Sequence, residues 1–497
     1  MNERMRGAAL SYVYMLIHII VSFINVPLML HFMGDSEYGL YQIVGSLMAY
    51  INVFETSISS GVLRFYCKAK ADNDKSAMEN TLALARLIYR YMSLIIAIFG
   101  IFLTYIFTLF YSKSFTETEL FESKWLLMIL IANLLVTMSN AVYLSAITAY
   151  ERYTFLRLLM IFSQILQPIL CYICLRFAPY AITIGLIMLV LNIVVALMRV
   201  VYFKKFLPTQ IMLHKKDKAF AKKIIVFSSG ILLASIADQI FWKTDQIILG
   251  RLFNTTVAAV YSVGAQIYYN YMNLGLQIST VFFPKISLLA SKENGLSLIS
   301  DLFIKIGRLT YDLLFLILVG FVLWGKVFLK LWVGDNYDDA YYVAIIVMIP
   351  FTIDLIQHSG LTILQVLDKY DFRAKLYFIA ACLNIVSTVI LANIWAGKGA
   401  ALSTGLTMFF TSGLILNIYY KNIGLDIKRF WKEIFVISVK LLPCLGVGCA
   451  IRIAMPIDNI LMFGIQILIF VVIYLIWIYI VCFNEYEKNL IKKIVKK

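Results

Sequence analysis

Long apolar stretches recur from one end of this 497-residue chain to the other, separated by short breaks that carry charges and turn-forming residues. Most stretches reach the roughly 20 residues that an α-helix needs to cross the hydrocarbon core of a bilayer. Only 14% of the residues are charged, against about 25% in a soluble domain. This pattern excludes a water-soluble enzyme, a secreted disulfide scaffold and a disordered protein. It predicts an all-α integral membrane protein.

The apolar stretches and their breaks predict about 14 transmembrane helices. They fall at 8–31, 40–64, 84–111, 125–148, 155–177, 180–203, 224–250, 257–284, 302–330, 341–366, 373–395, 397–420, 433–454 and 459–482. The connections between them are short, so no separate soluble domain is expected.

The basic residues predict the orientation of the chain. If the N-terminus is cytoplasmic, eight of the 44 Lys and Arg residues fall in outer loops and one, Lys243, falls inside a span, which leaves 35 on the inner side. Cytoplasmic loops of membrane proteins carry such an excess of Lys and Arg. Both termini are therefore expected in the cytoplasm. The net charge of +16 is explained by topology, and no nucleic-acid partner is predicted.

An internal repeat divides the predicted spans into two similar sets. The segments LSAITAYERYTF (144–155) and LTILQVLDKYDF (361–372) align, with Glu151 on Asp368 and Tyr153 on Tyr370. Because six spans separate the two segments, both copies have the same orientation in the membrane. Parallel repeats of this kind are typical of transporters that bind their substrate between two lobes.

The repeat predicts five parts of the chain, in a MATE-like arrangement of two pseudo-symmetric six-helix lobes followed by two extra helices. They are an N-terminal six-helix lobe (1–203), a basic cytoplasmic inter-lobe loop (204–223), a C-terminal six-helix lobe (224–420), two additional transmembrane helices (421–482) and a basic cytoplasmic tail (483–497). The loop is interpreted as a linker whose charges set the topology, or as a binding surface for anionic lipid head groups.

Three segments resemble one known family. The stretch PLMLHFMGDSEYGLYQIVGSLMAYINVFETSISSGVLRFY (27–66), the loop AYERYTFLR (149–157) and the segment TDQIILGRLFNTTVAAVYSVGAQI (244–267) are similar to parts of Wzx-type polysaccharide or O-antigen flippases. This oligosaccharide flippase family belongs to the multidrug/oligosaccharidyl-lipid/polysaccharide exporter superfamily, whose relatives include MATE drug antiporters and the lipid II flippase.

The resemblance implies a function and a location. A protein of this family is expected to move undecaprenyl-pyrophosphate-linked oligosaccharide across the bacterial cytoplasmic membrane by alternating access, for O-antigen, capsule or exopolysaccharide synthesis. It implies a transporter and no enzyme, so no catalytic residue is predicted. The expected partners are the lipid-linked oligosaccharide, membrane lipids and other polysaccharide assembly proteins.

Basic residues in or beside the predicted spans are the candidates for binding the substrate. Lys243, Arg64 and Arg251 are expected to attract pyrophosphate and acidic sugars in a water-filled cavity. The alternative for Lys243 is an ion pair with Asp238 or Asp245, or a side chain that extends to the outer surface. The alternative for both arginines is anchoring at the membrane interface.

Acidic residues near mid-depth are candidates for coupling transport to an ion gradient. Glu55, Asp238 and Asp354 are expected to bind a proton or a sodium ion, since a carboxylate is costly inside a membrane and often functional there. The alternative is a carboxylate satisfied by neighbouring helices. Asp245 is predicted to pack between lobes or to line the cavity. No cofactor and no metal site is predicted.

Uncharged amides are frequent in the spans as well. Most are expected to form hydrogen bonds between helices, and a few to bind sugar hydroxyls. They are Asn25, Asn52, Asn133, Gln164, Asn270, Asn273, Gln277 and Asn384.

Two other functions remain open. A MATE-like, ion-coupled antiporter for drugs or small molecules fits the repeat equally well, although a lysine within a span favours an anionic substrate. A membrane polysaccharide polymerase or glycosyltransferase is disfavoured. Its catalytic groups need a large outer loop, and the longest outer connections, 112–124 and 331–340, are short.

Overall fold

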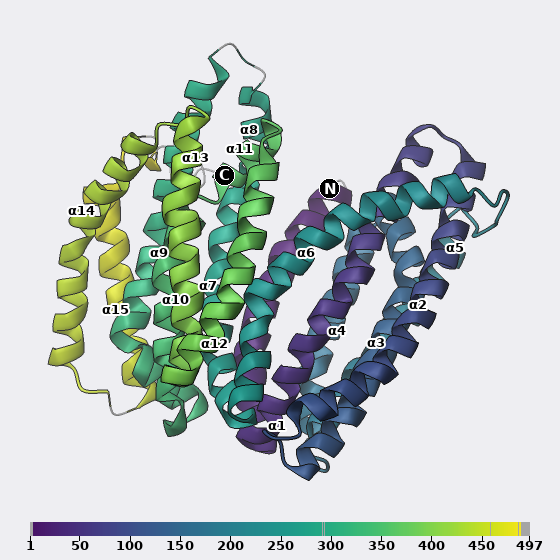
Figure 1. Ribbon diagram of the computed structural model, residues 1–497. Helices are drawn as coiled ribbons and strands as arrows, with labels where there is room; N and C mark the ends of the chain where they lie inside the picture. The colour runs from purple at the N-terminus through teal and green to yellow at the C-terminus, as the bar shows by residue number, and fades with distance from the viewer. Residues whose placement is uncertain (1–2, 291, 293, 458, 486, 489–497) are drawn as a thin grey trace. The chain divides into compact units, whose positions relative to one another are not determined.

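The computed structural model describes residues 3–488 with the exception of 291, 293, 458 and 486. Over these residues the chain consists of helices joined by short connections, and no strand occurs among them. Figure 1 shows this all-helical architecture. The fold class predicted from the sequence is confirmed. The predicted basic tail lies largely outside the described residues.

Packing divides the chain into two compact units, Met1–Ser262 and Val263–Lys497. The first unit contains six complete helices and the start of a seventh. These are α1 (Glu3–Ala71), α2 (Lys75–Tyr111), α3 (Glu117–Ala149), α4 (Tyr153–Cys174), α5 (Ala181–Phe206), α6 (Lys218–Leu252) and α7 (Thr255–Val281). The lobe boundaries inferred from the repeat are not tested by this division and stay a prediction.

The second unit continues from α7 with a larger number of shorter elements. They are α8 (Phe283–Ala290), α9 (Gly295–Val333), η1 (Asp335–Tyr337), α10 (Asp338–Ile356), α11 (Ser359–Val366), α12 (Tyr370–Met408), η2 (Phe409–Ile415), α13 (Leu416–Asn422), α14 (Ile427–Ala454), α15 (Ile460–Trp477) and η3 (Ile478–Cys482). In this unit α10 packs against α9 and α12, and α14 packs against α9 (Figure 1).

Eleven helices of the described chain are long and apolar enough to cross a membrane. Two of them contain a break that separates two stretches, each long enough to cross a membrane. In α1 the break is Gly34, whose φ of 76° is in the left-handed region that glycine tolerates. In α12 it lies at Trp395 and Ala396. These two breaks and α7, which is 27 residues long, account for the 14 predicted spans.

The two copies of the repeat have the same local structure. In the first copy α3 ends at Ala149 and α4 begins at Tyr153. In the second copy α11 ends at Val366 and α12 begins at Tyr370, at the same aligned positions. Glu151 and the aligned Asp368 both have a positive φ, of 57° and 54°. The amides that follow them also form equivalent bonds, Arg152 N–H to Ile147 O and Lys369 N–H to Leu364 O.

The connection between α5 and α6 is attached to the first unit by several contacts. His214 Nε2 lies 2.8 Å from Glu79 Oε2. The amide N–H groups of His214 and Lys215 donate to Asn80 Oδ1. Thr209 is buried and bonds to the hydroxyl of Tyr150. This basic connection is therefore packed against α2 and against the turn that follows α3.

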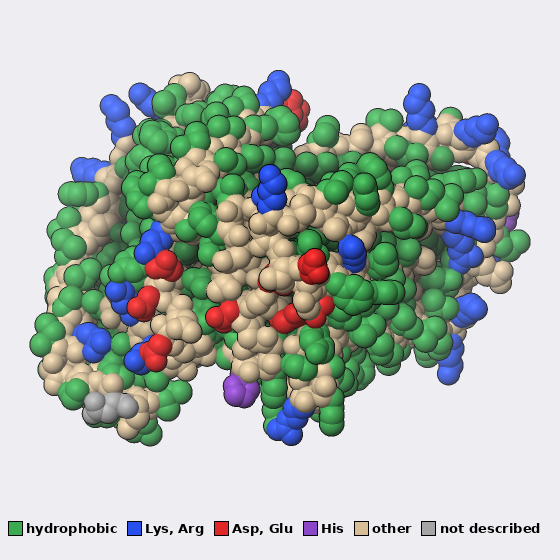
Figure 2. Space-filling model, turned by 60° about the horizontal axis from the view of Figure 1, so that its bottom comes forward, with side chains coloured by type: hydrophobic (Ala, Val, Ile, Leu, Met, Phe, Trp, Pro, Cys, Tyr) green, Lys and Arg blue, Asp and Glu red, His purple; other side chains and the backbone are tan. Residues whose placement is uncertain are grey.

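Large apolar side chains cover much of the surface. Tyr91, Leu94 and Ile98 on α2 are between 60% and 68% exposed, and Figure 2 shows hydrophobic side chains over most of the face that it presents. A soluble monomer rarely exposes contiguous apolar patches larger than a few hundred Å². The structure therefore agrees with a multi-pass membrane protein whose helices face lipid.

Arg308 is the centre of a buried charge cluster in the second unit. Arg308 on α9 donates from Nε to Glu487 Oε1 at 2.8 Å and from Nη1 to Glu433 Oε2 at 2.5 Å. Its Nη2 donates to Cys482 O and to Glu487 Oε2, both at 3.1 Å. Arg308 and Glu487 are 7% and 1% exposed. The segment after the last span is thus held against α9 by a buried ion pair.

Candidate functional site

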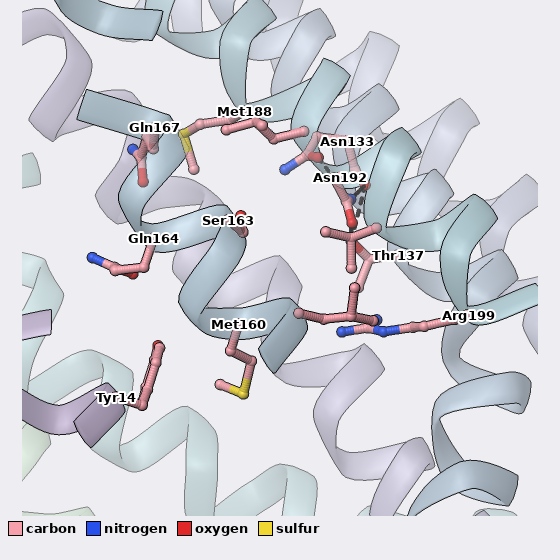
Figure 3. Close-up of a pocket in the computed structure, with 13 residues that line it drawn as sticks. Tyr14, Asn133, Thr137, Met160, Ser163, Gln164, Gln167, Met188, Asn192 and Arg199 are labelled. Carbon is pink, nitrogen blue, oxygen red and sulfur yellow. Dashed lines mark hydrogen bonds between the residues drawn. The ribbon is translucent and has the colours of Figure 1, made fainter. Parts of the chain in front are cut away.

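A polar cavity lies inside the first unit, among α1, α3, α4 and α5 (Figure 3). Its volume is about 320 Å³, at the lower end of the range of roughly 300–1,000 Å³ that is usual for ligand pockets. The lining residues are Tyr14, Asn133, Thr137, Leu159, Met160, Ser163, Gln164, Gln167, Met188, Leu191, Asn192, Val195 and Arg199. Eight of these 13 side chains are polar, whereas most ligand pockets are lined mainly by hydrophobic and aromatic side chains.

Helical spacing brings these polar groups to one place. On α3, Asn133 and Thr137 are one turn apart, and on α5, Asn192 and Arg199 are two turns apart. Residues at such spacings lie on the same face of a helix. α3 and α5 also pack directly against each other. In Figure 3, Tyr14, Met160 and Arg199 lie at one end of the cavity, and Gln167 and Met188 lie at the other.

Asn192 is at the centre of a hydrogen-bond network on one wall. Its Nδ2 is 2.8 Å from Asn133 Oδ1, 3.0 Å from Asn133 O and 2.7 Å from Thr137 Oγ1. The network fixes the rotamers of three lining residues. The opposite wall is formed by α4, which contributes Ser163, Gln164 and Gln167. Such amides and hydroxyls provide both donors and acceptors for the hydroxyl groups of a sugar.

Arg199 is the one cationic residue among those lining this cavity. Its Nη1 donates to Asn140 Oδ1 at 3.3 Å, and Asn140 in turn donates to Ala196 O. The Nε–H of Arg199 is buried and finds no acceptor among the residues that the structure describes. A planar guanidinium with unused donors is well suited to bind a phosphate group.

Glu55 on α1 is the carboxylate that interacts electrostatically with Arg199. It is 8% exposed and accepts a hydrogen bond of 2.6 Å from Ser59 Oγ. Ser59 also bonds to the hydroxyl of Tyr89. The charge of Glu55, a predicted ion-coupling residue, therefore acts on the arginine of the polar cavity.

The two predicted substrate-binding arginines lie elsewhere in the first unit. Arg64 is exposed, and its guanidinium lies 4.3 Å from the centre of the Phe227 ring. Arg251 donates from Nη1 to Ser114 Oγ at 3.3 Å, and its backbone carbonyl accepts a bond from the same hydroxyl. Neither lines the polar cavity, and their roles in binding substrate stay predictions.

The other predicted residues of α6 occupy different environments. Lys243 is half-buried and Asp238 is exposed. Asp245 is 2% exposed and accepts a hydrogen bond of 2.5 Å from the hydroxyl of Tyr261. The neighbouring Thr244 bonds to the hydroxyl of Tyr50 on α1. Asp245 therefore packs inside the first unit, and the functional assignments of all three residues stay predictions.

Asp354 lies in the second unit, in the last turn of α10. The predicted span 341–366 is interrupted after Ile356, so Asp354 is close to a helix end. Its Oδ1 accepts bonds from Tyr377 at 2.8 Å and from Ser412 at 2.5 Å. Arg373 lies 4.1 Å from the centre of the Tyr377 ring. The carboxylate is satisfied by neighbouring helices, and its role in coupling stays a prediction.

The sequence analysis missed Arg199 as a cavity residue. Because Arg199 is close to the inner end of the predicted span 180–203, it counts among the 35 basic residues that the topology places on the inner side. The available signal was its position two turns after Asn192, on a face that also carries Met188 and Val195. Asn133 and Gln164 were named as membrane amides, but their meeting in one cavity depends on helix packing.

Comparison with known proteins identifies the family. The profile of the family described as "Polysaccharide biosynthesis protein" matches residues 5–289, which is more than half of the chain. The chain belongs to this family. Residues 5–289 include every residue that lines the polar cavity. Among curated proteins, no sequence matches this member of the family.

Solved structures show that this polysaccharide biosynthesis protein has the fold of flippases and multidrug transporters. The structure titled "Lipid II flippase MurJ, inward closed conformation" matches with a TM-score of 0.75 and 17% identity, over 98% of this chain and 99% of that one. An inward-facing multidrug resistance MATE family transporter matches with a TM-score of 0.63 and 11% identity, over 84% of this chain and 99% of that one.

A third structure comes from Pyrococcus furiosus. It is a MOP superfamily transporter described as having a binding pocket of reverse polarity. It matches with a TM-score of 0.51 and 13% identity, over 86% of this chain and 94% of that one. All three are similar in fold. The family and the fold are those of transporters and flippases.

Proposed function

We propose that this protein translocates undecaprenyl-pyrophosphate-linked oligosaccharide from the inner to the outer leaflet of the bacterial cytoplasmic membrane. The exported repeat units would serve the synthesis of O-antigen, capsule or exopolysaccharide. The observation that carries the proposal is the polar cavity, in which seven uncharged polar side chains accompany Arg199. Its amides and hydroxyls match a sugar, and its guanidinium matches a phosphate.

Transport by alternating access would require a source of energy. Glu55, Asp238 and Asp354 are the residues that we propose to bind the coupling proton or sodium ion. Glu55 is the first to test because its carboxylate and Arg199 interact electrostatically. An ion bound at Glu55 would change the net charge that a pyrophosphate meets beside the cavity.

The direct test uses a strain in which the gene is deleted. We expect the strain to lose its surface polysaccharide and to accumulate lipid-linked repeat units on the inner face of the membrane. Expression of the wild-type protein should reverse both effects. Reconstituted vesicles, assayed with and without an imposed proton or sodium gradient, would then identify the coupling ion. Unchanged surface glycan and unchanged precursors after deletion would rule out the proposal.

A MATE-like antiporter is the second candidate because MATE transporters share the fold. The same deletion strain separates the two functions. An antiporter would make the strain more sensitive to cationic drugs and leave the lipid-linked precursors unchanged. A flippase would give the opposite pattern.

The proposed topology gives a further prediction. Reporter fusions at Lys215, in the connection between α5 and α6, and at Lys497 should both be active in the cytoplasm. The reason is that 35 of the 44 basic residues fall on one side when the chain is threaded through the predicted spans. Activity of a periplasmic reporter at either position would contradict this arrangement.

A further inference from the structure

A second cavity in the first unit is almost entirely apolar. It has a volume of about 260 Å³ and lies among α1, α2 and α6. The lining residues are Phe54, Ser57, Ile58, Ile88, Tyr91, Met92, Ile225, Ser228, Ser229 and Leu232. None of the residues that line the polar cavity contributes to it.

The serines of this apolar cavity do not make it polar. Ser57 donates to Val53 O at 2.7 Å, and Ser229 donates to Val226 O at 2.8 Å. Ser228 is buried where α1 and α6 approach closely, since a Cβ added at Gly61 would lie 2.4 Å from its Oγ, and this Oγ has no hydrogen-bond partner among the described residues. The surface that the cavity offers to a ligand is hydrocarbon all the same, which suits an aliphatic chain and not a sugar.

The cavity is open to the lipid-facing surface. Its lining residues Tyr91 and Ile225 are 68% and 51% exposed. In the predicted spans 40–64, 84–111 and 224–250, all lining residues lie in the half next to the cytoplasm. A ligand of this cavity would therefore enter sideways from the inner leaflet.

A cation lies one to two turns from the cavity on its cytoplasmic side. Arg64 follows Ile58 on α1, and its guanidinium is held 4.3 Å from the centre of the Phe227 ring. Phe227 immediately precedes the lining residue Ser228 on α6. No ion pair engages Arg64 within the part of the chain that the structure describes. Arg90, which is exposed on α2, immediately precedes the lining residue Tyr91.

We propose that the apolar cavity binds the isoprenoid chain of the lipid-linked substrate in the inner leaflet, with Arg64 binding its pyrophosphate. This inference rests on the proposed function and adds a site for the lipid part of the substrate. An aliphatic cavity in the inner leaflet with a cation toward the cytoplasm matches a long hydrocarbon chain that ends in an anionic group. Two arginines near the rim match the high charge of pyrophosphate better than the single charge of a phospholipid.

The test measures binding to the full-length protein in nanodiscs of phosphatidylethanolamine. The probes are radiolabelled undecaprenyl pyrophosphate and undecaprenol, with phosphatidylglycerol and inorganic pyrophosphate as competitors. Arg64→Ala should weaken binding of undecaprenyl pyrophosphate about fivefold to tenfold and leave binding of undecaprenol unchanged. Loss of one charge-assisted contact at a partly exposed site has an effect of this size.

A second variant tests the cavity itself. Ser229 is exposed at the rim, so Ser229→Trp should fill the cavity without disturbing a buried contact. It should weaken binding of both probes. The matched controls are Arg152→Ala, an exposed arginine on the same side of the membrane, and Ser139→Trp, an exposed serine of α3 with a similar bond to its own helix. Both controls should bind like the wild type.

Three results would overturn the proposal. These are equal binding of both probes by Arg64→Ala and the wild type, unchanged binding by Ser229→Trp, and displacement of the probe by phosphatidylglycerol as readily as by unlabelled undecaprenyl pyrophosphate. The last result would assign the site to bulk anionic lipid. The proposed function is judged separately, by translocation. A protein that binds the probe but moves no substrate would refute the function and leave the site intact.

Discussion

Replacing Arg199 by alanine should lower export of the lipid-linked oligosaccharide at least tenfold, while the amount of folded protein in the membrane stays near that of the wild type. Arg199 is the only cation among the residues that line the polar cavity, and its Nε–H has no acceptor among the described residues. A hydrogen bond to a charged group contributes about 1.5–3 kcal/mol, which corresponds to roughly 10- to 160-fold in binding. The measurement is complementation of the deletion strain, quantified by surface polysaccharide.

Two further variants separate binding from a structural role. Arg199→Lys keeps the charge but loses the planar fork, so it should retain part of the export. Asn140→Leu removes the side chain that accepts from Arg199 Nη1 and leaves the guanidinium in the cavity. If Arg199 serves only to hold Asn140, Arg199→Ala and Asn140→Leu should reduce export equally. A cavity role requires a clearly larger loss from Arg199→Ala. Arg152→Ala controls for the loss of a basic residue on the same side.

Glu487→Ala should destabilise the second unit by about 3–5 kcal/mol, because removal of one partner leaves a buried charge uncompensated. Glu487 is 1% exposed and contributes both carboxylate oxygens to Arg308. For a unit of this size the loss corresponds to a decrease in melting temperature of about 10 °C. Thermal unfolding of the purified protein in detergent, followed by size-exclusion chromatography, measures it.

The same arginine provides the matched control. Glu433 also pairs with Arg308, but its side chain is 37% exposed. Exposed ion pairs contribute about 0–1 kcal/mol, so Glu433→Ala should lower the melting temperature by only a few degrees. Equal effects of the two variants would show that burial of Glu487 has no energetic consequence. Because both variants remove one carboxylate, the difference between them measures the combined effect of the burial of Glu487 and its additional hydrogen bonds.

The helices were predictable from the sequence because the bilayer imposes a strong physical rule. A backbone in lipid must satisfy its own hydrogen bonds, so an apolar stretch of sufficient length becomes a helix. The repeat located the connections around Glu151 and Asp368, where both copies have a left-handed residue. The breaks at Gly34 and at Trp395 and Ala396 coincide with the predicted gaps between spans. The turn after Ile356 was not predicted, because no charged or proline-rich break marks it.

The sequence predicted some of the polar residues of the cavity but not the cavity itself. Asn133 and Gln164 were recognisable as amides inside spans, but which amides share a cavity depends on how α3, α4 and α5 pack. Arg199 was hidden because a basic residue near the inner end of a span has the same sequence signature as a topology charge. Lys243 was predicted to bind substrate because it is the one basic residue that the topology assigns to the interior of a span, yet it is not among the residues that line this cavity.

The buried pair between Arg308 and Glu487 also concerns how the chain is made. A ribosome synthesises Glu487 about 180 residues after Arg308, which takes roughly 10–35 s at about 5–20 residues per second. During this time α9 is already complete, but the buried carboxylate of Glu487 that pairs with Arg308 does not yet exist. The second unit therefore completes this ion pair only after Glu487 has been synthesised. A product truncated before Glu487 keeps an incompletely compensated arginine in α9, a feature by which quality-control proteases in the membrane would distinguish it from the finished protein.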